Sequence, residues 1–235
     1  MKYIFVSGGV ISGIGKEVVS SSVGTLLKSR GHVITHLKID PYLNYNAEFL
    51  APSEHGEVYV LEDGHECDMD FGNYERFNMM SLSRGNSIAG GRLFFDAIKC
   101  ERDGGFLGRT LQMNPYVIDD VVKRIKAVAS TPVVDFGSDG RGRLPEVVIV
   151  ELRGTVGEYE SSIYTEAFSK FQHIVDRDNC GFVSVDYMIV VEDQANTERM
   201  QELQGLWAAA RHYHLQGTES YYKGVQEEAS VHVLD

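Results

Sequence analysis

The sequence has few cysteines, no long apolar run and a shortage of positive charge. Its three cysteines, Cys67, Cys100 and Cys180, lie far apart without CxxC spacing. This spacing excludes a disulfide framework and a cysteine zinc site, and it favours a reducing compartment such as the cytoplasm. No uncharged apolar run approaches the roughly 18 residues that a membrane span needs. The amino-terminal residues also lack the long apolar region of a signal peptide, so we expect a soluble, untargeted chain.

Positive charge is scarce. The 235 residues contain 22 Lys and Arg against 34 Asp and Glu, which gives a formal net charge of -12. Nucleic acid is therefore excluded as the main partner, because phosphate backbones bind to basic surfaces. A few local lysines can still bind nucleotides. The length allows one large α/β domain, or a domain with a small appendage.

The amino-terminal third follows a strand, turn, helix, strand order. Tyr3–Val6 is a short apolar run typical of a buried strand, and glycines follow it. From Lys16 apolar residues recur at helical spacing as far as Gly31, a helix stop, and Val33–Ile39 is a second strand. A right-handed crossover of this kind places two parallel strands in one sheet. We therefore predict an α/β fold with a mainly parallel sheet flanked by helices, similar to P-loop NTPases and other Rossmann-like domains.

The remaining pattern predicts further strands and helices. Val147–Leu152 is the clearest buried strand, and Glu151 lies at its carboxyl end, where open α/β sheets bind ligands. An exposed loop is expected over 134–146. The other expected strands are 57–62 and 182–191, and the expected helices are 72–80, 87–104, 115–130 and 196–214.

The stretch "GGVISGIGKE" is a candidate phosphate-binding loop. Its glycines let backbone N–H groups converge on an anion, the helix amino end adds its dipole, and Lys16 adds a charge. The Walker pattern GxxxxGK[ST] is not met, because Val10 replaces the first glycine and Glu17 the hydroxyl residue. A tight turn that only joins a strand to a helix is the alternative. Glu17 is expected to repel bound phosphates.

Several motifs together resemble one family. "MKYIFVSGGVISGIGK", "KIDPYLN", "EHGEVYVLEDG", "DMDFGNYERF" and "ELRGTVGEYES" follow one another as in the amino-terminal synthetase (amidoligase) domain of CTP synthase. The resemblance is close over 1–171, while 172–235 diverges, and truncation of this region is one interpretation. We expect one amidoligase domain over 1–235 and no glutamine amidotransferase domain. None of the three cysteines has the context of a glutaminase nucleophile, so the chain should not hydrolyse glutamine.

The resemblance implies a carbon-nitrogen ligase that acts on nucleotides. ATP would phosphorylate the uracil 4-oxygen of UTP, and ammonia would displace the phosphate to give CTP. By resemblance, Lys16 and Lys38 would contact the ATP phosphates as catalytic residues, and Asp70 and Glu151 would hold Mg²⁺. The implied nucleotide-binding residues are Ser12, Gly13, Ile14, Gly15, Lys16, Glu17, Lys38, Asp70, Glu158 and Glu160.

Each of these residues has an ordinary structural alternative. Asp70 and Glu158 could be helix-start carboxylates, Lys38 a solvated lysine at a strand end, and Glu151 a loop carboxylate. For Glu158 and Glu160 the resemblance implies a place at the pyrimidine end of the site, where CTP binds as feedback inhibitor. There a carboxylate can accept a hydrogen bond from the cytosine amine.

The chain departs from the family pattern inside its motifs. Glu17 replaces a glycine, Arg153 interrupts a glycine pair, and Glu192 and Asp193 stand where lysines bind UTP phosphates. The alternative function is therefore a catalytically impaired homologue that binds nucleotide as a regulatory or structural partner in synthase oligomers. A truncated gene product without function is a third reading.

Assembly is also implied by the resemblance. The family's nucleotide sites lie between subunits, so we expect a homo-oligomer, or a hetero-oligomer with a full-length synthase. Trp207, the one tryptophan, lies on an apolar stripe of the expected helix 196–214. Such a stripe is more often core than interface, although aromatic residues are enriched at interfaces.

Overall fold

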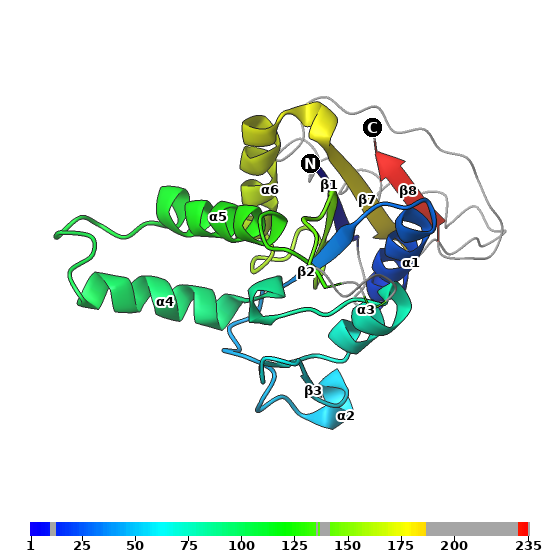
Figure 1. The fold of residues 1–235 in the computed structure, drawn as a ribbon. Helices are drawn as coiled ribbons and strands as arrows, with labels where there is room; N and C mark the ends of the chain where they lie inside the picture. Colours follow the sequence, from blue (N-terminus) through cyan, green and yellow to red (C-terminus); the bar gives the residue numbers. More distant parts are fainter. Residues whose placement is uncertain (10–12, 135, 137–141, 187–229, 235) are drawn as a thin grey trace, which may run out of the picture.

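The structure is a computed structural model that describes residues 1–9, 13–134, 136, 142–186 and 230–234 (Figure 1). Among these residues no helix is long and apolar enough to cross a membrane. The strands are β1 (Lys2–Gly8), β2 (Ile34–Asp40), β3 (Tyr59–Val60), β4 (Glu66–Cys67), β5 (Ser87–Ala89), β6 (Val147–Leu152), β7 (Cys180–Asp186) and β8 (Ser230–Leu234). The α-helices are α1 (Lys16–Ser29), α2 (Pro52–His55), α3 (Asp70–Asn78), α4 (Gly90–Arg102), α5 (Ile118–Ala129) and α6 (Ser162–Val175). Short helical turns are η1 (Arg84–Asn86), η2 (Met113–Val117) and η3 (Arg177–Asn179).

The main sheet has the strand order β5-β2-β6-β1-β7-β8. The first five strands in this order run parallel, and β8 pairs antiparallel with β7. The register places Lys38 of β2 opposite Glu151 of β6, and Glu151 opposite Val6 of β1. Because parallel strands end at the same edge of a sheet, this register brings a lysine and a carboxylate together beside the glycine-rich turn. The predicted α/β fold with a mainly parallel sheet is confirmed.

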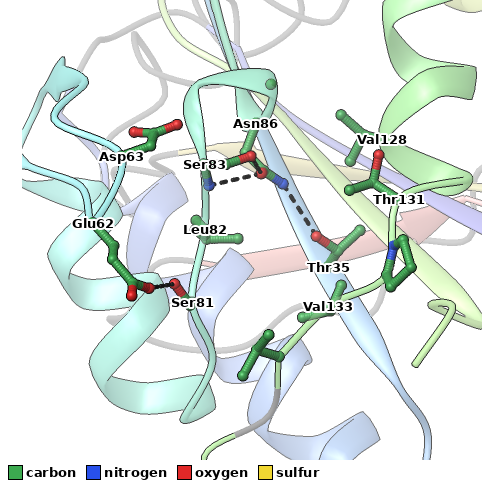
Figure 2. Close-up of a pocket in the computed structure, with 13 residues that line it drawn as sticks. Thr35, Glu62, Asp63, Ser81, Leu82, Ser83, Asn86, Val128, Thr131 and Val133 are labelled. Carbon is green, nitrogen blue, oxygen red and sulfur yellow. Dashed lines mark hydrogen bonds between the residues drawn. The ribbon is translucent and has the colours of Figure 1, made fainter. Parts of the chain in front are cut away.

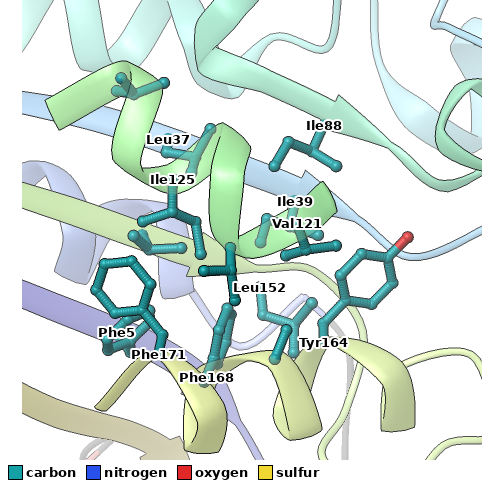
Figure 3. Packing of buried hydrophobic residues seen from close by; sticks show 14 of the residues in the cluster. Phe5, Leu37, Ile39, Ile88, Val121, Ile125, Leu152, Tyr164, Phe168 and Phe171 are labelled. Carbon is teal, nitrogen blue, oxygen red and sulfur yellow. The ribbon is translucent and has the colours of Figure 1, made fainter. Parts of the chain in front are cut away.

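Helices cover both faces of the sheet, and each face has its own core (Figure 1). On one face α5 and α6 pack on β1, β2 and β6, with Phe5, Ile125, Phe168 and Phe171 among the buried residues (Figure 3). On the other face α1 and α3 cover the sheet, and Tyr74 of α3 is fully buried there. The sequence of β6, buried at every position, reflects this double cover.

Helix α5 shows why these segments become helices. Its buried residues, Val121, Val122, Ile125 and Val128, recur at helical spacing and face the core. Asp119 and Asp120 in its first turn, and Lys126 in its last, have the charges that the helix dipole favours at each end.

Several predicted boundaries were wrong, and two helices, the four-residue α2 and α6, were not predicted. The expected helix 87–104 begins as strand β5, because Ser87–Ala89 pairs with Lys38–Asp40 of β2 before α4 starts. The expected strand 57–62 shortens to β3, and the helix expected from Pro115 begins at Ile118. Helix α6 was missed. The expected helix 196–214, with Trp207, lies outside the described residues, as does most of the last third of the chain.

Candidate functional site

The glycine-rich turn lies between the end of β1 and the start of α1. Gly13 and Gly15 have φ values of 76° and 85°, in the left-handed region that favours glycine, and Gly15 caps the helix. The first turn of α1 therefore begins directly at Lys16, with its free N–H groups at the turn. Ile14 belongs to the same turn, whereas predicted residue Ser12 lies outside the described residues. The backbone shape agrees with a phosphate-binding turn.

Lys16 is buried at the base of this turn. Its Nζ donates a hydrogen bond to the backbone oxygen of Gly154, at 3.0 Å. Burial lowers the pKa of Lys16, although the charges of Glu151 and Glu17 oppose this shift. Lys16 is therefore a buried residue of the turn, with 4% of its surface exposed.

Lys38 is buried at the carboxyl end of β2, with 3% of its surface exposed. Its Nζ forms ion pairs with Asp70 and, at 2.6 Å, with Oδ2 of Asp68. Burial alone would lower the pKa of Lys38, but Asp68, Glu151 and Asp70 together raise it. The lysine is thus a fixed positive charge among carboxylates, and the alternative of a solvated strand-end lysine is wrong.

Glu151 lies at the end of β6 with 2% of its surface exposed. Ser20 of α1 and Tyr74 of α3 donate hydrogen bonds to the same oxygen, Oε2, at 2.7 and 2.5 Å. Burial raises the pKa of Glu151, while Lys38 and the hydrogen bond from Tyr74 act in the opposite direction. The side chain is therefore a buried, oriented carboxylate in a strand and not a loop residue.

Tyr74 is itself held in place by a buried histidine. The rings of His36 and Tyr74 stack with centroids 4.5 Å apart. Burial lowers the pKa of His36 to about 3, so the imidazole is neutral at physiological pH. The hydroxyl of Tyr74 is consequently fixed toward Glu151.

Three carboxylates converge where α1, α3 and β6 meet. Glu17, Asp70 and Glu151 each offer one oxygen, and these oxygens lie within 4.8 Å of one another. Asp70 is the first residue of α3, so its helix-start position and its place in this cluster are compatible. Carboxylate oxygens are the ligands that Mg²⁺ prefers. The predicted pair Asp70 and Glu151 therefore fits a magnesium ion.

Arg153, which interrupts a glycine pair of the family pattern, is paired. Its Nη1 lies 3.0 Å from Oδ2 of Asp40 and 3.7 Å from Oδ2 of Asp68. Its Nη2 lies 2.9 Å from Nδ1 of His55. The guanidinium is thus neutralised by two carboxylates beside Lys38 and adds no unpaired charge to the site.

Glu158 lies beside the Gly154 carbonyl that binds Lys16. Its Oε2 accepts a hydrogen bond from the backbone N–H of Thr155, at 3.2 Å, and lies 3.5 Å from the hydroxyl of Tyr42. A methyl group on Gly154 would come within 2.8 Å of this oxygen. Glu158 is therefore packed against the lysine end of the site, whereas Glu160 is exposed.

A pocket of about 300 Å³ lies away from these residues (Figure 2). Thr35, Asn86, Val128 and Val133 line it, together with the carboxylates Glu62 and Asp63. Glu62 accepts a hydrogen bond from Ser81, and Asp63 accepts one from the backbone N–H of Arg84. The described residues that line the pocket include no lysine or arginine, so this lining does not suit a triphosphate.

Comparison with known proteins shows the family of the chain. The family model described as "CTP synthase N-terminus" matches residues 2–211. The chain belongs to the CTP synthase family. It is 69% identical over 192 residues to CTP synthase of Encephalitozoon cuniculi, an alignment that covers 82% of this chain and 36% of that protein. It is 50% identical over 179 residues to CTP synthase of Drosophila melanogaster (76% and 28% covered) and 45% identical over 202 residues to that of Schizosaccharomyces pombe (86% and 33% covered). The chain thus spans about a third of the length of these CTP synthases.

Sequence reasoning missed three residues that support the site in this family member. Asp68 is an ion-pair partner of Lys38, and Ser20 and Tyr74 orient Glu151. The alternating aspartates of "DMDFGNYERF" could have indicated Asp68, because residues 68 and 70 flank the start of one helix. Nothing in the local pattern points to Ser20 or Tyr74, whose contacts span 131 and 77 residues of chain.

The hydrogen bond from Tyr74 to Glu151 predicts a difference between two conservative variants. Tyr74→Phe should lower the free energy of unfolding by about 1.5–3 kcal/mol, the range for a hydrogen bond to a charged group. Tyr164→Phe is the matched control, because the hydroxyl of Tyr164 is buried without a partner among the described residues. Its removal should cost nothing or stabilise the protein. Urea denaturation measures both, and equal effects would contradict the prediction.

Proposed function

We propose that this chain is a CTP synthase-type ligase domain that aminates UTP to CTP with ATP, through a uracil phosphorylated at its 4-oxygen. The convergence of Lys16, Lys38, Asp70 and Glu151 at the carboxyl edge of the sheet carries this proposal. These residues come from two strands and two helices, and they have the chemistry that phosphoryl transfer needs. The names of the relatives support the same reaction class.

The residues of the turn and its neighbours would bind the triphosphate of ATP. The N–H groups at the start of α1 can donate to phosphate oxygens, and the buried ammonium of Lys16 lies directly beneath them. Because Lys16 is removed from water, its charge acts on a nearby phosphate more strongly than a surface lysine would. Lys16 would therefore stabilise negative charge that develops during transfer.

Asp70 and Glu151 would hold the magnesium ion of this site. When bound, Mg²⁺ supplies positive charge that offsets the charge of the phosphates. Lys38 keeps Asp68 and Asp70 in place through its ion pairs, so it acts both as a local cation and as a positioning residue. Ser20 and Tyr74 orient Glu151 through hydrogen bonds to Oε2, and neither bond uses its other oxygen, Oε1.

Glu158 would lie at the pyrimidine end of the nucleotide site. Its contacts with the Thr155 N–H and the Tyr42 hydroxyl hold the carboxylate next to Gly154. The backbone oxygen of Gly154 in turn accepts the hydrogen bond from Lys16. A carboxylate there can accept a hydrogen bond from the amine of CTP. Glu160, which is exposed, would add negative charge at the rim of the site.

Assembly into homo-oligomers, or with a full-length synthase, remains a prediction.

The test is product formation by the purified chain. ATP, UTP, ammonium and Mg²⁺ are supplied together, CTP is separated by chromatography, and reactions that omit ATP or UTP are the controls. Calorimetry measures the binding of each nucleotide separately. We expect CTP that depends on both nucleotides.

Each other outcome has a clear meaning. Binding of both nucleotides without CTP would favour the alternative, a nucleotide-binding regulatory or structural partner in synthase oligomers. Glu192 and Asp193, acidic where the family has lysines, favour that alternative in the sequence but lie outside the described residues. No binding of either nucleotide would overturn the proposal.

A further inference from the structure

We propose that Glu17 is a third carboxylate ligand of the divalent-cation site, so that this chain binds the cation without nucleotide. This inference rests on the proposed function, because it adds a residue to the cation site of that reaction. The resemblance placed Glu17 among the nucleotide-binding residues, and its charge was expected to repel phosphates. The structure places its carboxylate beside those of Asp70 and Glu151.

The geometry brings Glu17 to the other two carboxylates. It lies in the first turn of α1, Asp70 opens α3, and Glu151 ends β6, yet one oxygen of each lies within 4.8 Å of the others. Oxygens on opposite sides of a magnesium ion are about 4.2 Å apart, since each bond is about 2.1 Å long. Small side-chain rotations would therefore bring all three oxygens to one ion.

The hydrogen bonds of the cluster leave ligand atoms available. Among the described residues the carboxylate of Glu17 has no hydrogen bond and no ion pair. Both hydrogen bonds to the buried Glu151 end on Oε2, which leaves Oε1 without a donor in the same part of the chain. Three like charges at this spacing repel one another, and Lys38, which pairs with Asp70 and acts on Glu151, offsets only part of this repulsion. A bound cation would offset the rest.

The nearby lysines have other partners and do not form an ion pair with Glu17 among the described residues. Lys38 pairs with Asp68 and Asp70, and Lys16 donates to the carbonyl oxygen of Gly154. The charge of Glu17 acts on the ammonium of Lys16, but no ion pair joins Glu17 to either lysine in the described part of the chain, so its carboxylate can still bind a cation from solution. The same charge opposes ATP phosphates when no cation is present and supports the metal complex of ATP when a cation is bound.

The first experiment measures Mn²⁺ binding to the full chain without nucleotide, by electron paramagnetic resonance and by calorimetry. We expect one bound ion in the unaltered chain and a loss of affinity of about tenfold or more in Glu17→Gln, within the 10–100-fold range that even supporting groups of metal sites contribute. Glu101→Gln is the matched control, because Glu101 is exposed on α4 and the charge change is the same. Thermal melting of each variant confirms that it folds.

Asp70→Asn separates failure of this inference from failure of the proposed function. If Asp70→Asn weakens Mn²⁺ binding and Glu17→Gln does not, Glu17 is not a ligand and the two-carboxylate site stands. If neither change affects Mn²⁺ binding, the inference fails and the cation site assigned to the reaction fails with it. If no Mn²⁺ binds without nucleotide, the inference alone fails, and the cation site of the reaction is then tested with ATP present.

The second experiment measures ATP binding to the same variants with EDTA and with Mg²⁺. We expect Glu17→Gln to tighten ATP binding in EDTA, because a negative charge next to the phosphates is removed, and to weaken it in Mg²⁺. Tighter binding under both conditions would show that Glu17 only repels phosphates and would overturn the inference.

Discussion

Replacing Lys38 with methionine should abolish CTP formation and lower the free energy of unfolding by about 3–5 kcal/mol, the cost of breaking a buried ion pair from one side. The ammonium of Lys38 is buried and pairs with Asp68 and Asp70, and Glu151 also acts on its charge. Methionine keeps much of the side-chain volume but leaves these carboxylates without their cation. The remaining negative charges would repel both one another and the phosphates of ATP.

The measurement is urea denaturation together with the assay for CTP. Lys99→Met is the control for charge, because Lys99 is exposed on α4, and it should behave as the unaltered chain. The double variant Lys38→Met with Asp68→Asn should recover part of the lost stability, since one repelling charge is gone, but no activity. A stable and active Lys38→Met variant would contradict the roles assigned to Lys38.

The site residues that could be predicted lie where local pattern and topology coincide. Lys16 follows a glycine turn that opens a helix, and Glu151 ends the most apolar strand of the chain. Parallel strands end at one edge of the sheet, so both positions were expected at that edge once the α/β order was recognised, and the pairing of β1 with β6 brings them close together. Lys38, at the end of the next strand in the sheet, follows by the same argument.

The residues that could not be predicted depend on contacts between distant segments. Tyr74 reaches Glu151 only because α3 packs on the same face of the sheet as α1, which no local pattern shows. The pairing of Arg153 with Asp40 and Asp68 likewise joins two strand ends and the segment before α3. Glu17 was interpreted from charge alone, which indicates repulsion, whereas its distance to Asp70 and Glu151 is a property of the packed structure.

The errors in secondary structure have different causes. Ser87–Ala89 became strand β5 because it pairs with β2, a tertiary contact that outweighs the helical pattern of the residues after it. Helix α6 could have been recognised, because Tyr164, Ala167, Phe168 and Phe171 recur at helical spacing. The core they form is the basis of a further prediction.

Replacing Phe171 with alanine should lower the free energy of unfolding by about 3–5 kcal/mol, the usual cost of such a truncation in a packed core. Phe171 of α6 is 0% exposed. Its ring contacts that of Tyr3 of β1, with centroids 4.6 Å apart and an interplanar angle of 76°. It also contacts the ring of Phe5 of β1, with centroids 5.9 Å apart and an angle of 72° (Figure 3). The truncation would therefore remove two edge-on aromatic pairs and leave a cavity between α6 and the strand that leads into the glycine turn.

Urea denaturation measures this loss, and Phe49→Ala is the matched control because Phe49 is 90% exposed. The control should change the free energy of unfolding by no more than about 0.5 kcal/mol, as expected for a surface substitution. Phe171→Leu should lie between the two, since leucine fills part of the cavity. Equal stability of Phe171→Ala and Phe49→Ala would mean that α6 does not pack on β1, and the position of the glycine turn relative to the sheet would then lose its support.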